Sequence, residues 1–236
     1  LPIFSVDQFS GLTLEQTRHG LVALANLHSG TTNDDELFGR EWLNGTKAAL
    51  APLYQSILPG LFTTFLDRFR HADADILELV TNFAHRLPHY SAQASPYECV
   101  VHGDFRTDNL LFEGRGGEVP LAVVDWQTVS VSSPFLDVAY FLVTSLEPQL
   151  LLGAADELLD VYLEERSRLG SPIPRDAARS ELARYALQPV AMLVPASVIV
   201  EQTDRGDRMF VEMLRRATVI CTAWKSLEEL DRYVAA

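Results

Sequence analysis

The octapeptide HGDFRTDN, His102–Asn109, holds a dense group of polar side chains, and short apolar runs lie on both sides of it. Glu98–Val101 precedes it and predicts a strand that ends at the octapeptide. Leu110–Phe112 and Leu121–Val124 follow it and predict two more strands. Residues 114–117, GRGG, separate these two strands and favour a turn. We therefore expect a β-hairpin directly after the octapeptide.

The expected hairpin brings two oxygen-bearing side chains together. Asn109 lies just before its first strand, and Asp125 lies just after its second. Antiparallel pairing places two such positions side by side, about 5 Å apart at Cα. An aspartate carboxylate and an asparagine carbonyl suit a hard cation such as Mg²⁺, which keeps several waters and completes its shell with substrate phosphates. We therefore predict a magnesium site at Asn109 and Asp125.

Two residues within the octapeptide point to phosphoryl transfer. Asp104 lies on the loop before the hairpin, five residues before Asn109, so it can face the same point without being a metal ligand. A carboxylate at that place can accept the proton of an attacking hydroxyl. Arg106 can supply positive charge to the phosphoryl group in transit. A surface ion pair between Arg106 and Asp108 is an equally good explanation of that arginine.

The pattern HGDFRTDNLLF followed by VVDWQ resembles the catalytic loop and metal-binding segment of the aminoglycoside phosphotransferase and ecdysteroid kinase-like families, small-molecule relatives of the protein kinases. The resemblance implies that Asp104 is the catalytic base and that Asn109 and Asp125 bind Mg²⁺. It implies ATP as the co-substrate and a hydroxyl of a small molecule as the acceptor. Asp125 takes the place of the kinase DFG aspartate, although Trp126 and Gln127 follow it here.

The same resemblance gives supporting roles to two further residues. Asp137, in the run PFLDVAYFL, resembles the buried aspartate that holds the catalytic loop by hydrogen bonds in these families. His102 is expected to shape the loop, with an acid–base or metal-ligand role as the less favoured alternative. DQFSGLTLEQ at 7–16 and GDRMFVEMLRRA at 206–217 extend the likeness over nearly the whole chain, but only as a carboxyl-terminal lobe.

The rest of the sequence predicts helices. Thr13–Gln16 has the pattern of a capping box, so a helix is expected over residues 13–29. Further helices are expected at about 46–58, 73–86, 134 onward, 152–169, 175–187, 189–203 and 207–230. The predicted fold class is therefore α+β, predominantly α. The resemblance makes it the carboxyl-terminal lobe of a protein-kinase-like fold, with a small β-hairpin that carries the active site.

The sequence lacks the features of a nucleotide-covering lobe. In kinases the smaller lobe supplies a phosphate-covering loop, a strand lysine and a helix glutamate. The lysines here are Lys47 and Lys225, neither lies in a strand resembling VAIK, and no GxGxxG occurs. We expect residues 1–236 to form the catalytic and substrate lobe, with the amino-terminal nucleotide-binding lobe absent from this chain. A catalytically silent kinase-like lobe that acts as a binding module is the alternative.

Composition limits the partners. The chain has 236 residues, 47% of them hydrophobic, enough for one domain with a sizeable core. Its formal net charge of -13 argues against nucleic acid or an anionic membrane surface as a partner. The apolar run Val190–Val200 is shorter than the roughly 20 residues of a bilayer span. Cys99 and Cys221 read as core thiols, so a cytoplasmic location is expected.

Two further readings stay open at this point. His102, Asp104 and Asp125 together fit a metal-dependent hydrolase, which is the least favoured function. The acidic groups at 34–36, 156–157 and 201–207 either line a pocket for a cationic substrate or form a solvated surface, and the second reading is favoured. The sequence identifies neither the acceptor nor the oligomeric state.

Overall fold

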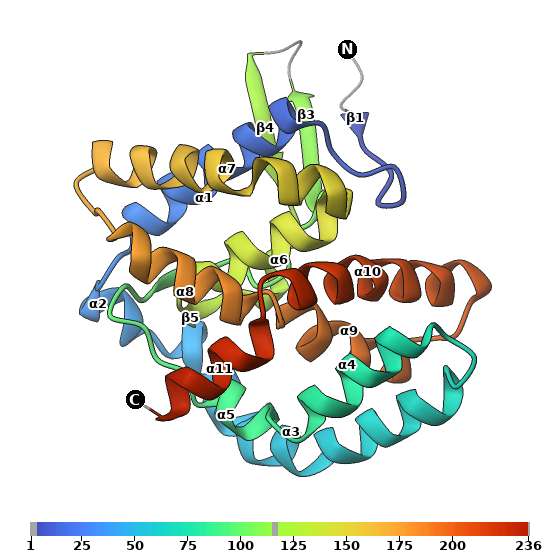
Figure 1. Cartoon of the computed structure of the whole chain (residues 1–236). Helices are drawn as coiled ribbons and strands as arrows, with labels where there is room; N and C mark the ends of the chain where they lie inside the picture. Colours follow the sequence, from blue (N-terminus) through green and yellow to red (C-terminus); the bar gives the residue numbers. More distant parts are fainter. Residues whose placement is uncertain (1–3, 115–117, 236) are drawn as a thin grey trace.

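The computed structural model describes residues 4–114 and 118–235, so Gly116 and Gly117 of the expected turn lie outside the described residues. The α-helices are α1 (Leu14–Ser29), α2 (Asp35–Phe38), α3 (Glu41–Arg68), α4 (Ala74–Ala84), α5 (Leu87–Ser91), α6 (Phe135–Ser145), α7 (Pro148–Arg168), α8 (Arg175–Tyr185), α9 (Gln188–Ile199), α10 (Asp204–Ala223) and α11 (Ser226–Ala235). The strands are β1 (Phe4–Ser5), β2 (Cys99–Val101), β3 (Leu110–Gly114), β4 (Val119–Val123) and β5 (Ser130–Ser132). This proportion of helix to strand confirms the predicted α+β, predominantly α class (Figure 1).

The expected hairpin is present. β3 and β4 pair antiparallel, with Leu110 opposite Val123, and β1 joins the outer side of β3. The hairpin extends away from the helical body at one end of the molecule (Figure 1). A separate pair of strands, β2 and β5, lies at the base of the loop that contains the octapeptide. The sequence pattern predicted β2 but not β5.

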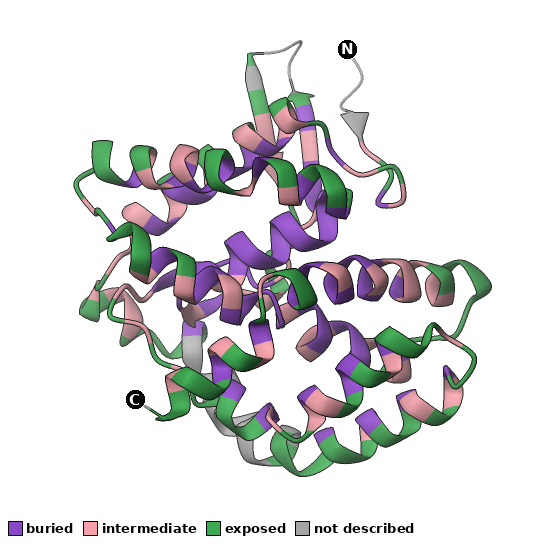
Figure 2. Cartoon of the chain, in the orientation of Figure 1, coloured by how far each residue is buried: buried purple, intermediate pink, exposed green. Residues whose placement is uncertain are grey.

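Helix α6 is the centre of the core. All of its residues except Leu136 are buried, as expected for a helix that is apolar on every side (Figure 2). It packs against α8, α9 and α10. Asp137 is the one charged residue of this helix, and it is fully buried. A charge at the centre of the core must find hydrogen-bond donors, which determines the geometry described below.

Two predicted helix boundaries are wrong. The helix expected at 46–58 is α3, which runs from Glu41 to Arg68 because Leu58, Phe62 and Phe65 continue one buried face past the prolines. The helix expected at 207–230 is divided into α10 and α11. Lys225 adopts a left-handed backbone between them, with φ of 53°, and the resulting turn lets α11 pack against α8.

The stretch Arg175–Ile199 has the length and apolar composition of a membrane span. In this structure it forms α8 and α9, and 61% of its most apolar window is buried among the other helices. It therefore serves as part of the core here. Cys99 and Cys221 are both buried free thiols, as predicted.

A buried arginine joins the beginning of the chain to its last long helix. Arg216 of α10 is fully buried and donates to the backbone carbonyl oxygens of Gln8, Phe9 and Thr144 at 3.3, 2.7 and 3.1 Å. Its Nε donates to Glu212 at 3.0 Å on the same helix. The planar guanidinium therefore fixes the segment before α1 against α6 and α10.

We expect Arg216→Lys to lower the free energy of unfolding by about 2–4 kcal/mol, because an ammonium group cannot reach three carbonyl oxygens at once. Urea unfolding followed by circular dichroism measures this loss. Arg205→Lys is the matched control on α10, since Arg205 is exposed. Equal stability of the two variants would contradict this account of Arg216.

Candidate active site

The carboxylate of Asp137 fixes the start of the octapeptide. It accepts hydrogen bonds from the backbone N–H groups of His102 and Gly103, at 2.6 and 2.8 Å. His28 of α1 donates to it through Nε2 at 3.3 Å. Three donors from two parts of the chain thus surround a charge that water cannot reach. Asp137 therefore fixes the octapeptide to helix α6 in the core.

Gly103 is required at its place in the loop. Its φ is +85°, in the left-handed region, and a Cβ there would lie 2.6 Å from the carbonyl oxygen of Thr128. The hydroxyl of Thr128 donates to the carbonyl oxygen of His102 at 2.8 Å. The octapeptide and the segment after β4 are therefore in close backbone contact, which leaves no room for a larger residue.

His102 uses both ring nitrogens within the loop. Its Nε2 donates to the carbonyl oxygen of Val124 at 3.0 Å, and its Nδ1 accepts from the backbone N–H of Asp104 at 3.2 Å. The side chain is fully buried. Neither nitrogen is available to a metal or a substrate, so the geometry suits the loop-shaping role. His102 is therefore not available as a ligand in the metal-dependent hydrolase alternative, which required His102, Asp104 and Asp125.

Asp104 and Asn109 are locked together. The amide Nδ2 of Asn109 donates to the carbonyl oxygen of Asp104 at 2.8 Å and to its carboxylate at 3.0 Å. The Asp104 side chain is mostly covered and keeps 14% of its surface exposed, so it is held by the protein and remains partly accessible to solvent. This is the geometry of a positioned proton acceptor.

Arg106 lies between two carboxylates. Its Nε is 3.2 Å from a carboxylate oxygen of Asp104, and its Nη1 donates to Asp108. Burial opposes the charged form of this side chain, but the two aspartates outweigh it and raise the pKa of Arg106. Arg106 therefore pairs with Asp108, as one of the two sequence readings expects, and it also contacts the predicted base.

Tyr140 is a neighbour of the site that the sequence analysis missed. It lies one helical turn after Asp137 on α6, so both point to the same loop. Burial, followed by the charge of Asp104, raises the pKa of Tyr140 well above its ordinary value. The hydroxyl therefore stays protonated beside the Asp104 carboxylate. The i, i+3 spacing from Asp137 was the available signal.

The two predicted metal ligands lie at the open end of the hairpin. The backbone N–H of Val124 donates to the carbonyl oxygen of Asn109 at 3.0 Å, so Asn109 faces Val124 and Asp125 lies one residue further than expected. Asp125 is exposed and left-handed, with φ of 65°, and Gln127 contacts its carboxylate at 3.4 Å. Such strain in a non-glycine residue is typical of functional sites.

These residues fit a magnesium ion. The amide nitrogen of Asn109 is committed to Asp104, which leaves its carbonyl oxygen free to coordinate, and Asp125 offers an exposed carboxylate. Two oxygen ligands suit an ion that brings its own water and phosphate oxygens. Among residues 4–114 and 118–235, no three His, Cys, Asp or Glu side chains cluster in the way that an all-protein metal site requires.

A cleft of about 760 Å³ opens beside the octapeptide at Gly103. Its walls come from α3, α5, α9 and β5, and residues 127–129 also line it. This volume accommodates a drug-sized molecule. The cleft therefore lies next to the octapeptide, which it contacts at Gly103.

The sequence matches the model of a known protein family over more than half of its length. The model described as the ecdysteroid kinase-like family matches residues 4–168, the part of the chain that contains β1 to α7. The chain belongs to the ecdysteroid kinase-like family. The resemblance inferred from HGDFRTDN and VVDWQ is thereby confirmed at the level of the family.

This ecdysteroid kinase-like chain also has curated relatives. Mouse acyl-CoA dehydrogenase family member 10 is 31% identical over 137 residues, which are 56% of this chain and 12% of that protein. Chicken acyl-CoA dehydrogenase family member 11 is 36% identical over 75 residues, 31% of this chain and 9% of that protein. The chain thus matches about a tenth of the length of these relatives.

Among solved structures, an ADP-bound aminoglycoside phosphotransferase, APH(2'')-Ib, is similar to this chain. The alignment covers 93% of this chain and 70% of the phosphotransferase chain, at 14% sequence identity and a TM-score of 0.42.

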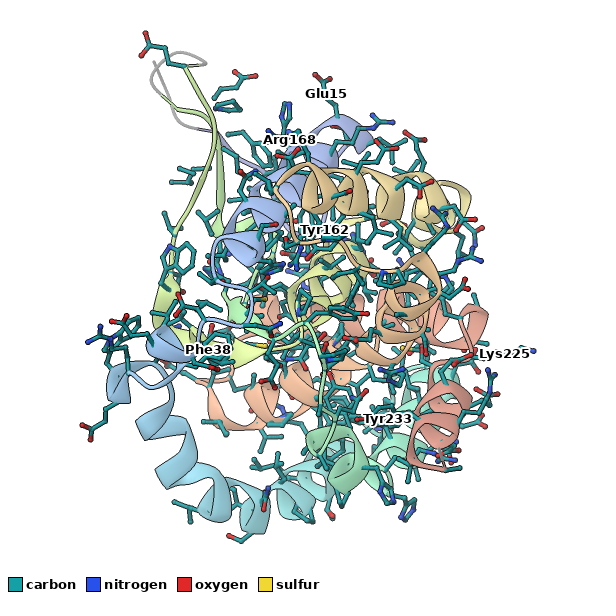
Figure 3. All side chains as sticks on the ribbon, turned by 90° about the vertical axis from the view of Figure 1, so that its left-hand side faces the viewer. Glu15, Phe38, Tyr162, Arg168, Lys225 and Tyr233 are labelled. Carbon is teal, nitrogen blue, oxygen red and sulfur yellow. The ribbon has the colours of Figure 1, made fainter. Side chains whose placement is uncertain are left out.

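His28 links the active-site loop to a second buried group. Its Nδ1 is 2.9 Å from the hydroxyl of Tyr162, which lies in the interior of the helical body (Figure 3). Burial lowers the pKa of His28 below its ordinary value of 6.5, although Asp137 favours the charged form. The imidazole is therefore neutral in the folded chain, with its Nε2 proton donated to Asp137.

We expect the free energy of unfolding to fall as the pH drops below about 6.5. The unfolded chain then binds a proton at His28 that the folded chain rejects, which costs up to about 1.4 kcal/mol per pH unit. Urea unfolding between pH 7.5 and 5.5 tests this, and His28→Gln should show a shallower decrease. His71→Gln, at an exposed position, should keep the original dependence. An unchanged slope in His28→Gln would refute the assignment.

Proposed function

We propose that the protein transfers the γ-phosphoryl group of ATP to a hydroxyl of a small molecule bound in the cleft beside Gly103. One observation carries the proposal: the Asp104 carboxylate stays partly accessible, yet it is held by Asn109 and Arg106 on a loop that the core fixes through Asp137. Family membership supports small-molecule phosphotransfer in general.

Each residue of the site has a distinct part in this proposal. Asp104 accepts the proton of the acceptor hydroxyl, and Asn109 orients that carboxylate through its amide nitrogen. Asn109 and Asp125 would hold Mg²⁺, which neutralises charge on the phosphates of bound ATP. Arg106 steadies Asp104 and adds positive charge beside the reacting group.

Asp104→Asn in the full-length protein should lower phosphotransfer by about 10²- to 10⁴-fold, because an amide cannot accept the hydroxyl proton. The change is nearly isosteric, so the thermal unfolding midpoint should stay within a few degrees. Release of ADP with a panel of uncharged alcohols as acceptors provides the measurement. Asp156→Asn is the matched control, since its carboxylate pairs with Arg179 on another face. Full activity in Asp104→Asn would remove Asp104 as the proton acceptor, whereas no ADP release by the unmodified protein with any acceptor would favour the binding-module alternative.

Asp125→Asn should raise the Mg²⁺ concentration for half-maximal activity by at least about tenfold, because an anionic ligand is replaced by a neutral one. Asp125 is exposed, so the free energy of unfolding without Mg²⁺ should change by less than about 0.5 kcal/mol. A magnesium titration of the initial rate gives the answer. An identical magnesium dependence in the variant would remove Asp125 from the metal site.

A further inference from the structure

Arg166 on α7 carries a positive charge that is fully buried. Its Nε donates to the carbonyl oxygen of Ser171 at 3.1 Å, and its Nη2 donates to the hydroxyl of Thr32 at 3.0 Å. Its Nη1 donates to the hydroxyl of Tyr162 at 3.3 Å. These three acceptors are uncharged, so they satisfy the guanidinium group without neutralising it. A buried charge in this state is costly unless an opposite charge lies within reach.

Asp137 on α6 is a buried charge of the opposite sign. Its hydrogen-bond donors are two backbone N–H groups of the octapeptide and the Nε2 of His28. His28 does not neutralise it, because burial, with a smaller contribution from Arg166, lowers the pKa of the imidazole. Burial raises the pKa of the Cys99 thiol, and Asp137 and Arg166 shift that pKa further in opposite directions. The two charges therefore lie around the same side chain.

A chain of hydrogen bonds joins these two charges. An arginine can only donate, so the Tyr162 hydroxyl accepts from Arg166 and keeps its own proton for another acceptor. That acceptor is the Nδ1 of His28, which lies 2.9 Å from the hydroxyl. The Nε2 of His28 then donates to Asp137 at 3.3 Å. The relay formed by these four residues runs in one direction from cation to anion, an arrangement in which each bond polarises the next.

We propose that Arg166 is the counter-charge of Asp137 and, through the relay between them, a positioning residue for the octapeptide. Without the relay, the Asp137 carboxylate is less well compensated in the core, and its hold on the backbone N–H groups of the octapeptide weakens. The inference rests on the proposed function, in which the octapeptide carries the proton acceptor Asp104. Arg166 itself takes no part in proton transfer.

Arg166 also has a local role, which a test must separate from the relay. Its bonds to Ser171 and Thr32 hold the turn after α7 against the turn after α1, and the hydroxyl of Ser171 donates to that of Ser29 at 2.7 Å. Loss of these bonds alone loosens the two turns. Loss of the relay alone loosens the octapeptide, which lies in a different part of the chain.

Hydrogen–deuterium exchange of the full-length protein at pH 7.5, with mass spectrometry of its peptides, measures both regions at once. Tyr162→Phe removes the hydroxyl at the centre of the relay and keeps the bonds from Arg166 to the turns. The octapeptide should then exchange at least about tenfold faster, the effect of weakening one buried hydrogen bond. The peptide across residues 169–173 should exchange as in the unmodified protein.

Arg166→Lys should give the reverse pattern. It keeps the positive charge but loses the planar fork that reaches Ser171 and Thr32. Residues 169–173 should exchange faster, while exchange of the octapeptide stays within about threefold of that in the unmodified protein. Arg168→Met is the matched control on α7, since Arg168 is exposed and pairs with Glu165. It should alter neither region.

Arg166→Met removes the charge at nearly constant length, so both regions should exchange faster. Combined with Tyr162→Phe, it should add less than about twofold to the exchange of the octapeptide, because the relay is already broken. Tyr162→Phe and Arg166→Lys decide the question even where Arg166→Met does not fold. Unchanged exchange of the octapeptide in Tyr162→Phe, or equal acceleration of both regions in Arg166→Lys, would overturn the proposal.

The proposed reaction is tested separately from the relay. Tyr162→Phe should lower kcat for ADP release, and Arg166→Lys should preserve it, because only the first change releases the loop that carries Asp104. Faster exchange of the octapeptide in Tyr162→Phe, without phosphotransfer by the unmodified protein, would reject the proposed reaction and support the role of Arg166. Phosphotransfer with no response of the octapeptide to Tyr162→Phe would reject the relay and keep the reaction.

Discussion

The hydrogen bonds to the buried carboxylate of Asp137 are the constraint on which the site depends. A carboxylate in an apolar helix is tolerated only with several donors, and two of these are consecutive backbone N–H groups of the octapeptide. Folding of α6 into the core therefore requires the loop to adopt one conformation. Because the buried carboxylate needs these hydrogen bonds, the position of the loop is fixed when α6 packs into the core.

Further hydrogen bonds fix the outer residues of the loop relative to its base. His102 ties the loop to the segment after β4, and Asn109 ties the end of the loop back to Asp104. The N–H donors of both side chains are used in bonds to neighbouring protein atoms, which leaves the carbonyl oxygen of the Asn109 amide without one of these bonds. A preorganised site of this kind needs little rearrangement when a ligand arrives.

The sequence was sufficient for the parts of the fold that local patterns determine. The hairpin and its two flanking residues followed from apolar runs and glycines, and the family followed from HGDFRTDN with VVDWQ. The full length of α3 and the break at Lys225 depend on packing between distant segments, which local propensity does not contain. For the same reason the contact from Tyr140 and the relay from Arg166 to Asp137 were found only in three dimensions.

Arg216 has a mechanical consequence. Its guanidinium binds the carbonyl oxygens of Gln8 and Phe9, ahead of α1, and also the end of α6 at Thr144. The chain ahead of Gln8 is also joined to the hairpin by the pairing of β1 with β3, so tension from the amino-terminal side is carried by that pairing and by the Arg216 hydrogen bonds before it reaches α1. The Arg216 anchor thus protects α1, and with it the contact of His28 to Asp137, from movement of the segment that precedes α1.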